Sequence, residues 1–281
     1  MKSLSIGKGE EEKMKKLFYN IVIVGVGGTG GLLANFLCKT LAKRKDVCVT
    51  LVDADVVEEK NLVRQPYMEE DIGSCKAEAL ADALQDAYGL NVLAENCFID
   101  NADDLGRIFY RGRGVYKCES EDRWCNQLRE IRILCGCVDN HAARKCMHEY
   151  FACRTDYNSY NAPLLYADSG NEFSFGEVVF GVSVDGEVKA PDKVHYFPDL
   201  FDGDMTPRSQ ESCEALNESA PQHFTTNLMA ATIMLSGISR LIQDGIFPTG
   251  IVNFDSGITG NFRMSAFPFK DNKKPGEAVK K

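Results

Sequence analysis

The chain has 281 residues, of which 44% are hydrophobic, and this is enough for one large α/β domain or for one domain with an appendage. The net charge of -9 and the pI of about 5.1 provide no basic excess to neutralise phosphates, which argues against nucleic acid as the main partner. No apolar run has the length of a membrane span, and the 11 cysteines and an N-terminus without the apolar core of a signal peptide predict a reducing, cytoplasmic location.

The first strong pattern is a β-branched run at residues 21–24, which leads into the glycine-rich turn Gly25-Val26-Gly27-Gly28-Thr29-Gly30. A helical apolar pattern follows at residues 32–41. A strand, a turn and a helix with glycines in this spacing are typical of dinucleotide-binding folds, because glycine allows a tight turn and a close approach of backbone N–H groups to a phosphate. The start of the helix then offers free N–H groups and a partial positive charge to an anion.

A second apolar strand is expected at residues 47–52 and ends at Asp53, whose carboxylate can accept hydrogen bonds from a ribose. Taken alone, this unit favours an ordinary NAD-binding Rossmann protein. The next loop changes the interpretation, since it carries Asn61, Arg64 and Gln65 where the carboxyl ends of the strands bind ligands. The guanidinium of Arg64 suits a phosphate, and a hydride-transfer site does not need it.

Two further segments supply side chains for a triphosphate. A helix predicted over residues 76–88 has Lys76 in its first turn, and a buried strand predicted over residues 131–138 is followed by Asp139, which can hold Mg²⁺ between phosphate oxygens. An Arg, a Lys and a metal-binding Asp suit nucleotidyl transfer, because they stabilise charge as pyrophosphate leaves. For any one of these residues, the alternative is a solvated surface charge or, for Asp139, a helix N-cap.

The remaining patterns continue the alternation of strands and helices. Strands are expected over residues 91–99 and 163–168, helices over 9–17, 103–110 and up to about 151, and a polar, turn-rich insertion over 112–129. Beyond residue 170 the chain is β-rich at 176–184, 251–255 and 261–267, with a long loop over 185–221 and a helix over 223–242. The prediction is an α/β fold with a Rossmann-like, mostly parallel twisted sheet flanked by helices, and a C-terminal antiparallel extension. We expect a single domain over residues 1–281, with a nucleotide-binding core at 18–170 and the sheet extension, crossover loop and C-terminal helix at 171–269.

Together the motifs resemble the ThiF/MoeB/HesA superfamily, which includes bacterial activators of sulfur-carrier proteins and the adenylation domains of ubiquitin-activating enzymes. The matching pieces are the glycine loop, Asp-x-Asp with Asn-Leu-x-Arg-Gln, the Gly-x-x-Lys helix start and Asp-Asn-x-x-x-Arg, in family order between residues 21 and 144. The resemblance looks greatest to stand-alone ThiF-related proteins of bacterial gene cassettes. It implies adenylation of the C-terminal glycine carboxylate of a small ubiquitin-like or ThiS-like carrier protein, with ATP and Mg²⁺, by a homodimer.

The resemblance also assigns roles to individual residues. Asp53 would bind the ribose, Arg64 and Lys76 the phosphates, and Asp139 the Mg²⁺ ion. The expected nucleotide-binding set is completed by glycines of the loop and by polar residues beside it: Gly25, Gly27, Gly28, Gly30, Asp55, Asn61, Gln65 and Asn140.

Cys213, in the long loop, is the remaining candidate for a catalytic residue. In many relatives a cysteine in a mobile loop accepts the activated acyl group, but Glu214 beside it would raise its pKa, so a nucleophile and an inert thiol both remain open. Two features depart from the relatives. First, the chain has no Cys-x-x-Cys pair, so we expect no structural zinc. Second, no arginine lies before Arg44 in the chain, so none is available near the N-terminus to reach the ATP site of a partner subunit, although Lys15 or Lys16 would be a substitute.

Three alternatives remain open. A ThiF-fold enzyme that activates a small-molecule or RNA-linked carboxylate would share the ATP site and differ only in the acceptor. An NAD-dependent oxidoreductase would bind NAD and would not need Arg64 or Mg²⁺. A non-catalytic scaffold would keep the fold and the dimer surface, although the retained Arg, Lys and Asp argue against it.

Overall fold

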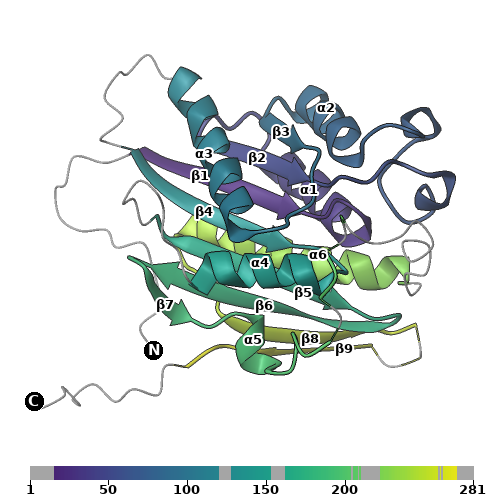
Figure 1. The fold of residues 1–281 in the computed structure, drawn as a ribbon, viewed down its shortest axis with the longest axis vertical. Helices are drawn as coiled ribbons and strands as arrows, with labels where there is room; N and C mark the ends of the chain where they lie inside the picture. Colours follow the sequence, from purple (N-terminus) through teal and green to yellow (C-terminus); the bar gives the residue numbers. More distant parts are fainter. Residues whose placement is uncertain are drawn as a thin grey trace, which may run out of the picture.

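The computed structural model describes residues 16–119, 128–152, 162–203, 205–207, 209, 222–258, 260 and 262–270. Five strands are parallel to one another: β1 (Lys16–Val24), β2 (Val47–Val52), β3 (Asn91–Glu95), β4 (Leu128–Gly136) and β5 (Leu164–Asn171). Four are antiparallel to their neighbours: β6 (Phe175–Val184), β7 (Glu187–Ala190), β8 (Gly250–Ser256) and β9 (Phe262–Phe267). These strands form one sheet in the order β3-β2-β1-β4-β5-β6-β8-β9, with β7 paired to β6 (Figure 1).

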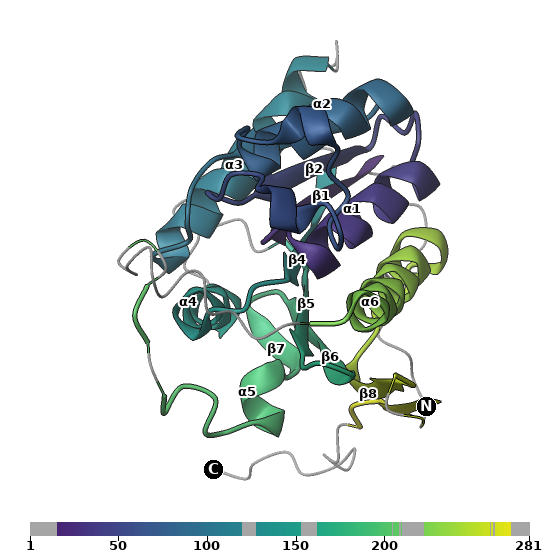
Figure 2. The same cartoon turned by 90° about the vertical axis from the view of Figure 1, so that its right-hand side faces the viewer.

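Helices cover both faces of this sheet: α1 (Gly28–Thr40), α2 (Lys76–Tyr88), α3 (Ala102–Glu119), α4 (His141–Ala152), α5 (Lys193–Tyr196) and α6 (Phe224–Asp244). Figure 2 shows α1 and α6 on one face and α3 and α4 on the other. One hydrophobic core lies under α1, α2 and α6, and a second lies under α3 and α4. The mixed architecture with its C-terminal antiparallel strands confirms the predicted fold class. Within the described ranges, no helix combines the length and the apolar character that a membrane crossing requires.

The residues of the central strand β1 explain why helices cover both faces of the sheet. Ile21 and Ile23 are fully buried in the first core, and Val22 between them is fully buried in the second. A continuous β-branched run of this kind is typical of a parallel strand with helices on both faces. Helices α2 and α6 end at Gly89 and Gly245, whose φ angles of 61° and 68° suit glycine at a helix C-terminus.

The strand order also locates the expected ligand position. From β1 the chain moves outward to β2 and β3, and it then returns to place β4 on the other side of β1. Open α/β sheets bind ligands outside the carboxyl ends of the strands, at the point where the order reverses in this way. The segments after β1 and β4 meet there, since the backbone N–H of Cys137 donates to the carbonyl of Val24 at 2.9 Å.

One predicted helix boundary is wrong. Helix α3 continues to Glu119, whereas the sequence predicts a helix only to residue 110 and a turn-rich insertion from 112. Gly112 lowers the helix propensity of this segment, but it also allows close packing, because a Cβ there would lie 2.5 Å from Oδ1 of Asn20 in β1. Packing against the sheet therefore overrides the local signal, and residues 120–127 lie outside the described residues.

The other differences are at loops and chain ends. The predicted long loop over residues 185–221 contains β7 and α5, because Asp185 and Gly186 adopt positive φ angles of 54° and 78° and turn the chain back along β6. Strand β3 ends at Glu95, before residue 99, and β1 begins at Lys16, inside the predicted helix over 9–17, of which residues 9–15 lie outside the described residues.

Candidate active site

The glycine loop is packed so closely that larger residues do not fit. Gly25 has a φ of 83°, its N–H donates to the carbonyl of Val52 at 2.8 Å, and a Cβ on it would lie 2.8 Å from the carbonyl oxygen of Cys137. A Cβ on Gly30 would lie 1.8 Å from the carbonyl oxygen of Gly25. Helix α1 begins at Gly28, directly after Gly27, so the free N–H groups of its first turn face the ligand position.

Asp53 connects the end of β2 to this loop. Its Oδ2 atom accepts a hydrogen bond from the N–H of Val26 at 2.8 Å, and its Oδ1 atom accepts one from the N–H of Asp55 at 2.9 Å. Burial raises the pKa of Asp53 above its ordinary value, and the nearby charge of Lys76 opposes this increase. Each carboxylate oxygen has a second lone pair, so the two backbone bonds leave acceptor capacity for a ligand hydroxyl.

Lys76 begins α2 and lies close to the same strand end. Its Nζ atom is 3.1 Å from Oδ2 of Asp55, and its N–H donates to the carbonyl of Asp55 at 2.9 Å. The side chain of Lys76 is only 9% exposed. The hydroxyl of Tyr67 donates to the carbonyl of Val26 at 2.8 Å and lies 3.3 Å from the carbonyl of Lys76. The start of α2 is therefore held against the glycine loop.

Asn61 shapes the loop that carries the predicted arginine. Its Oδ1 atom accepts from the N–H of Glu58 at 2.8 Å, and its carbonyl accepts from the N–H groups of Arg64 at 3.0 Å and Gln65 at 2.9 Å. The side chain of Asn61 thus accepts a backbone hydrogen bond within the turn to which it belongs. The Gln65 amide lies over Gly27, 3.7 Å from the position of a Cβ there, and its buried Oε1 atom has no hydrogen-bond partner among the described residues.

Arg64 is joined to the glycine loop through the C-terminal part of the chain. Its Nη1 atom donates to the carbonyl of Gln222 at 3.0 Å, and Nε2 of Gln222 donates to the carbonyl of Asn171 at 3.1 Å. The side chain of Asn171 then donates to the hydroxyl of Thr29 in the first turn of α1 at 2.7 Å. Arg64 is therefore connected to the first turn of α1 through Gln222 and Asn171.

The loop between β4 and α4 contains the predicted metal ligand. Asp139 is exposed in this loop. Asn140 caps α4, because its Oδ1 atom accepts from the N–H of Ala143 at 3.0 Å, and its Nδ2 atom donates to the carbonyl of Thr206 at 3.1 Å. The amide of Asn140 is thus used within the protein, and Asn140 rather than Asp139 is the helix cap.

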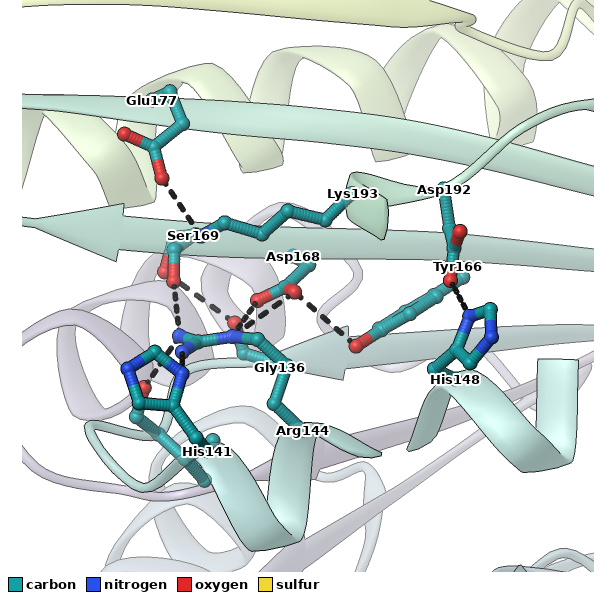
Figure 3. A network of polar contacts seen from close by, with 11 residues as sticks. Gly136, His141, Arg144, His148, Tyr166, Asp168, Ser169, Glu177, Asp192 and Lys193 are labelled. Carbon is teal, nitrogen blue, oxygen red and sulfur yellow. Dashed lines mark hydrogen bonds and ion pairs between the residues drawn. The ribbon is translucent and has the colours of Figure 1, made fainter. Parts of the chain in front are cut away.

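Arg144 holds this loop in place through the polar network drawn in Figure 3. Its Nε atom lies 3.1 Å from the carboxylate of Asp168, and its Nη2 atom donates to the carbonyls of Val138 at 2.8 Å and Ser169 at 3.0 Å. The side chains of Arg144 and Asp168 are 6% and 1% exposed. The last residue of the motif Asp-Asn-x-x-x-Arg is therefore a buried support for the strand ends.

Beside it, two ion pairs connect the start of α5 to β6 and to α4 (Figure 3). Nζ of Lys193 lies 2.7 Å from Oε1 of Glu177 in β6, and Nδ1 of His148 in α4 lies 2.6 Å from Oδ2 of Asp192. The hydrogen bond to Asp192 raises the pKa of His148.

Sequence reasoning missed three residues that form a polar network with Thr29 of the glycine loop: Asn171, Gln222 and Asn227. Two of them have a signal in the sequence. Asn171 ends a buried strand, as Asp53 does, and Asn227 is a buried amide in a helix that is otherwise largely apolar.

Cys213 lies outside the described residues. Among the described cysteines, Cys137 is the one at the end of β4, and burial raises its pKa to about 12, so it is not a ready nucleophile. Within the described ranges, no three or more His, Cys, Asp or Glu side chains group together as metal ligands.

The reversed strand order and the glycine loop define a Rossmann-like α/β fold. The chain belongs to the ThiF family, which it matches over residues 2–274. Ubiquitin-like modifier-activating enzyme 5 from Oryza sativa subsp. japonica is 29% identical to it over 133 residues, which are 47% of this chain and 29% of the rice protein.

Solved structures with a similar fold include E. coli MccB with ATP, at a TM-score of 0.56 and 17% identity, covering 89% of this chain and 63% of MccB. PaaA is similar with a TM-score of 0.56 and 16% identity, covering 91% of this chain and 64% of PaaA. This chain therefore spans less than two thirds of the length of each of these proteins. At these identities the two structures bear on the fold alone.

Proposed function

We propose that this protein is an ATP-dependent adenylyltransferase that activates the C-terminal glycine carboxylate of a small ubiquitin-like or ThiS-like carrier protein. Membership of the ThiF family supports this class of reaction. The observation that carries the proposal is the position of two cations from separate segments: Arg64 bonds the carbonyl of Gln222, and Lys76, paired with Asp55, starts a helix that Tyr67 links to Val26 of the glycine loop. A hydride-transfer site does not require this pair, whereas a reaction that releases pyrophosphate does.

In the proposed reaction, the carrier carboxylate attacks the α-phosphorus of ATP, carrier-AMP forms and pyrophosphate leaves. The N–H groups at the start of α1 bind phosphate oxygens. Arg64 and Lys76 stabilise the negative charge that accumulates as pyrophosphate departs. Because Lys76 is already held by Asp55, it is positioned before the nucleotide arrives and loses little freedom on binding. Asp53, with its remaining lone pairs, accepts from the ribose.

Asp139 is the residue proposed to hold Mg²⁺. A single carboxylate fits this ion, because Mg²⁺ usually binds through one or two carboxylates together with substrate phosphates and water. Bound there, the ion would offset phosphate charge. Arg144 contributes indirectly, since its bonds to the carbonyls of Val138 and Ser169 hold the loop that carries Asp139.

The acceptor is the finer part of the proposal. The rice relative, by its name, activates a ubiquitin-like modifier, and this favours a protein carboxyl terminus. The structures of similar fold include MccB with N-formylated MccA, so a different carboxylate-bearing acceptor is the second candidate. The ATP site would be the same in both cases, and only the acceptor would differ.

Two experiments test the reaction class. ATP with Mg²⁺ should raise the thermal unfolding midpoint, whereas NAD and NADH should not, because only a ligand of the native state stabilises it. In an ATP–pyrophosphate exchange assay with carriers that end in glycine, Arg64→Ala and Lys76→Met should each lower the rate by roughly 100-fold or more.

The matched control is Lys60→Met, which removes an exposed lysine of the same loop and should keep the wild-type exchange rate. A carrier without its terminal glycine controls for the acceptor. Stabilisation by NAD alone, or normal exchange in Arg64→Ala, would refute the proposal. Exchange with other carboxylates but with no carrier would favour the second candidate.

A further inference from the structure

Asn227, near the start of α6, lies against the glycine loop but has no role in the reaction as described so far. It is only 2% exposed. Its amide fills the space above Gly28, since a Cβ on Gly28 would lie 2.1 Å from Nδ2 of Asn227. Gly28 is the first residue of α1, so this amide stands beside the helix N-terminus at which a nucleotide phosphate binds.

Two hydrogen bonds fix which way the amide of Asn227 points. Its Oδ1 atom lies 3.2 Å from Oγ1 of Thr29 and 3.2 Å from Nδ2 of Asn171. Because the Thr29 hydroxyl accepts from Asn171 at 2.7 Å, its single proton is available for Asn227. Oδ1 is therefore the acceptor in this cluster, and Nδ2 is directed to the other side, over Gly28.

That Nδ2 group lacks a protein acceptor within the described part of the chain, although its residue is almost completely buried. Nδ2 itself is not among the fully buried side-chain atoms without a partner, so this donor is open to a ligand beside the loop. The donor is thus held rigidly, unpaired, next to free backbone N–H groups of α1. Such a set of donors is complementary to an anion.

We propose that Asn227 is a phosphate-binding residue, whose Nδ2 group donates a hydrogen bond to a phosphate oxygen of the nucleotide at the glycine loop. Only the identity of that nucleotide rests on the proposed function. The triphosphate of ATP and the pyrophosphate of NAD would both offer a phosphate oxygen to this donor. Helix α6 thereby completes a phosphate site whose other groups come from residues 25–76. Gly28 has a specific reason to be glycine, because any side chain would displace this amide.

The test compares ATP with adenosine, which has no phosphate, by calorimetric titration of the full chain. Asn227→Ala removes the donor, and Asn227→Asp keeps an oxygen for Thr29 and Asn171 but places a negative charge beside the phosphates. We expect ATP affinity to fall roughly ten-fold in Asn227→Ala and further in Asn227→Asp, with adenosine affinity unchanged. Thr232→Ala is the control, because this exposed threonine bonds only within α6, to the carbonyl of Leu228.

The outcomes separate this inference from the proposed function. Equal losses for ATP and adenosine would mean that Asn227 only shapes the loop, and unchanged ATP affinity in both variants would mean that it makes no phosphate contact; either result overturns the inference. If the wild-type protein binds NAD and not ATP, the proposed function fails. The same pair of titrations with NAD and adenosine then decides the role of Asn227.

Discussion

The guanidinium of Arg144 and the carboxylate of Asp168, 3.1 Å apart and almost completely buried, join the end of β5 to the loop that follows β4. The same guanidinium bonds the carbonyls of Val138 and Ser169, so one side chain holds two neighbouring strand ends. Burial lowers and Asp168 raises the pKa of Arg144, and the net pKa is raised, so the guanidinium stays charged. A buried pair of this type is costly to break from one side, because the remaining charge has no partner.

Arg144→Met tests this directly. We expect the free energy of unfolding to fall by about 3–5 kcal/mol, since Asp168 would be left as a buried, unpaired charge. Denaturant unfolding followed by circular dichroism measures the change. Lys145→Met, at the exposed neighbouring position on α4, should change stability by less than about 0.5 kcal/mol. Equal effects of the two substitutions would contradict the supporting role of Arg144.

Glycine-to-alanine substitutions at Gly30, in the glycine loop, and at Gly106, in α3, should have opposite effects on stability. Gly30→Ala should destabilise the protein by about 1–3 kcal/mol and remove stabilisation by ATP, because the methyl group would lie 1.8 Å from the carbonyl oxygen of Gly25. Gly106→Ala should stabilise it by about 0.5–1 kcal/mol, because among the described residues no atom outside the backbone of α3 itself and the chain neighbours of Gly106 lies within 4 Å of a Cβ there. Thermal unfolding with and without ATP measures both, and a tolerated Gly30→Ala would refute the loop packing.

The His148–Asp192 pair predicts a pH dependence of stability. The pKa of His148 is raised in the folded protein, so its contribution is fully present below the unfolded value of about 6.5 and is lost as the pH rises through the folded pKa. The difference in unfolding free energy between wild type and His148→Gln should therefore shrink as the pH rises above the unfolded value of about 6.5 and through the raised folded pKa. Denaturant unfolding across this range measures it. His195→Gln is the control, and a difference that grows with pH would contradict the prediction.

Cys213 remains a prediction that mass spectrometry can decide. With ATP and a carrier that ends in glycine, wild-type protein should gain the mass of the carrier through a thioester, as the thiolate attacks the acyl-adenylate and AMP leaves. Cys213→Ser should lose this thiol-labile adduct and keep ATP–pyrophosphate exchange, because adenylation precedes the transfer. Cys97→Ser, at a partly exposed cysteine of the described residues, is the control. An adduct that survives in Cys213→Ser would identify Cys213 as an inert thiol.

Much of the fold was predictable because its signals are local. The run Ile21, Val22, Ile23 reads as a strand buried on both faces, and the helix expected over residues 76–88 has the bounds of α2. Predictions failed where packing between distant segments overrides local preference. The helix through Gly112 is the clearest case, since only the proximity of Asn20 in β1 shows why glycine is accommodated there.

The sequence by itself determined the relative positions of groups that lie close together along the chain. The glycine loop is short, and Asp53, Asp55 and Lys76 follow within a strand end and a helix start, so their convergence follows from the βαβ pattern. Only the tertiary structure decided the rest. Thr29 meets Asn171, 142 residues away, and Asn227, 198 residues away, because the sheet order places β5 and α6 beside α1. Contacts between residues so far apart depend on how complete elements pack, and no local pattern encodes that.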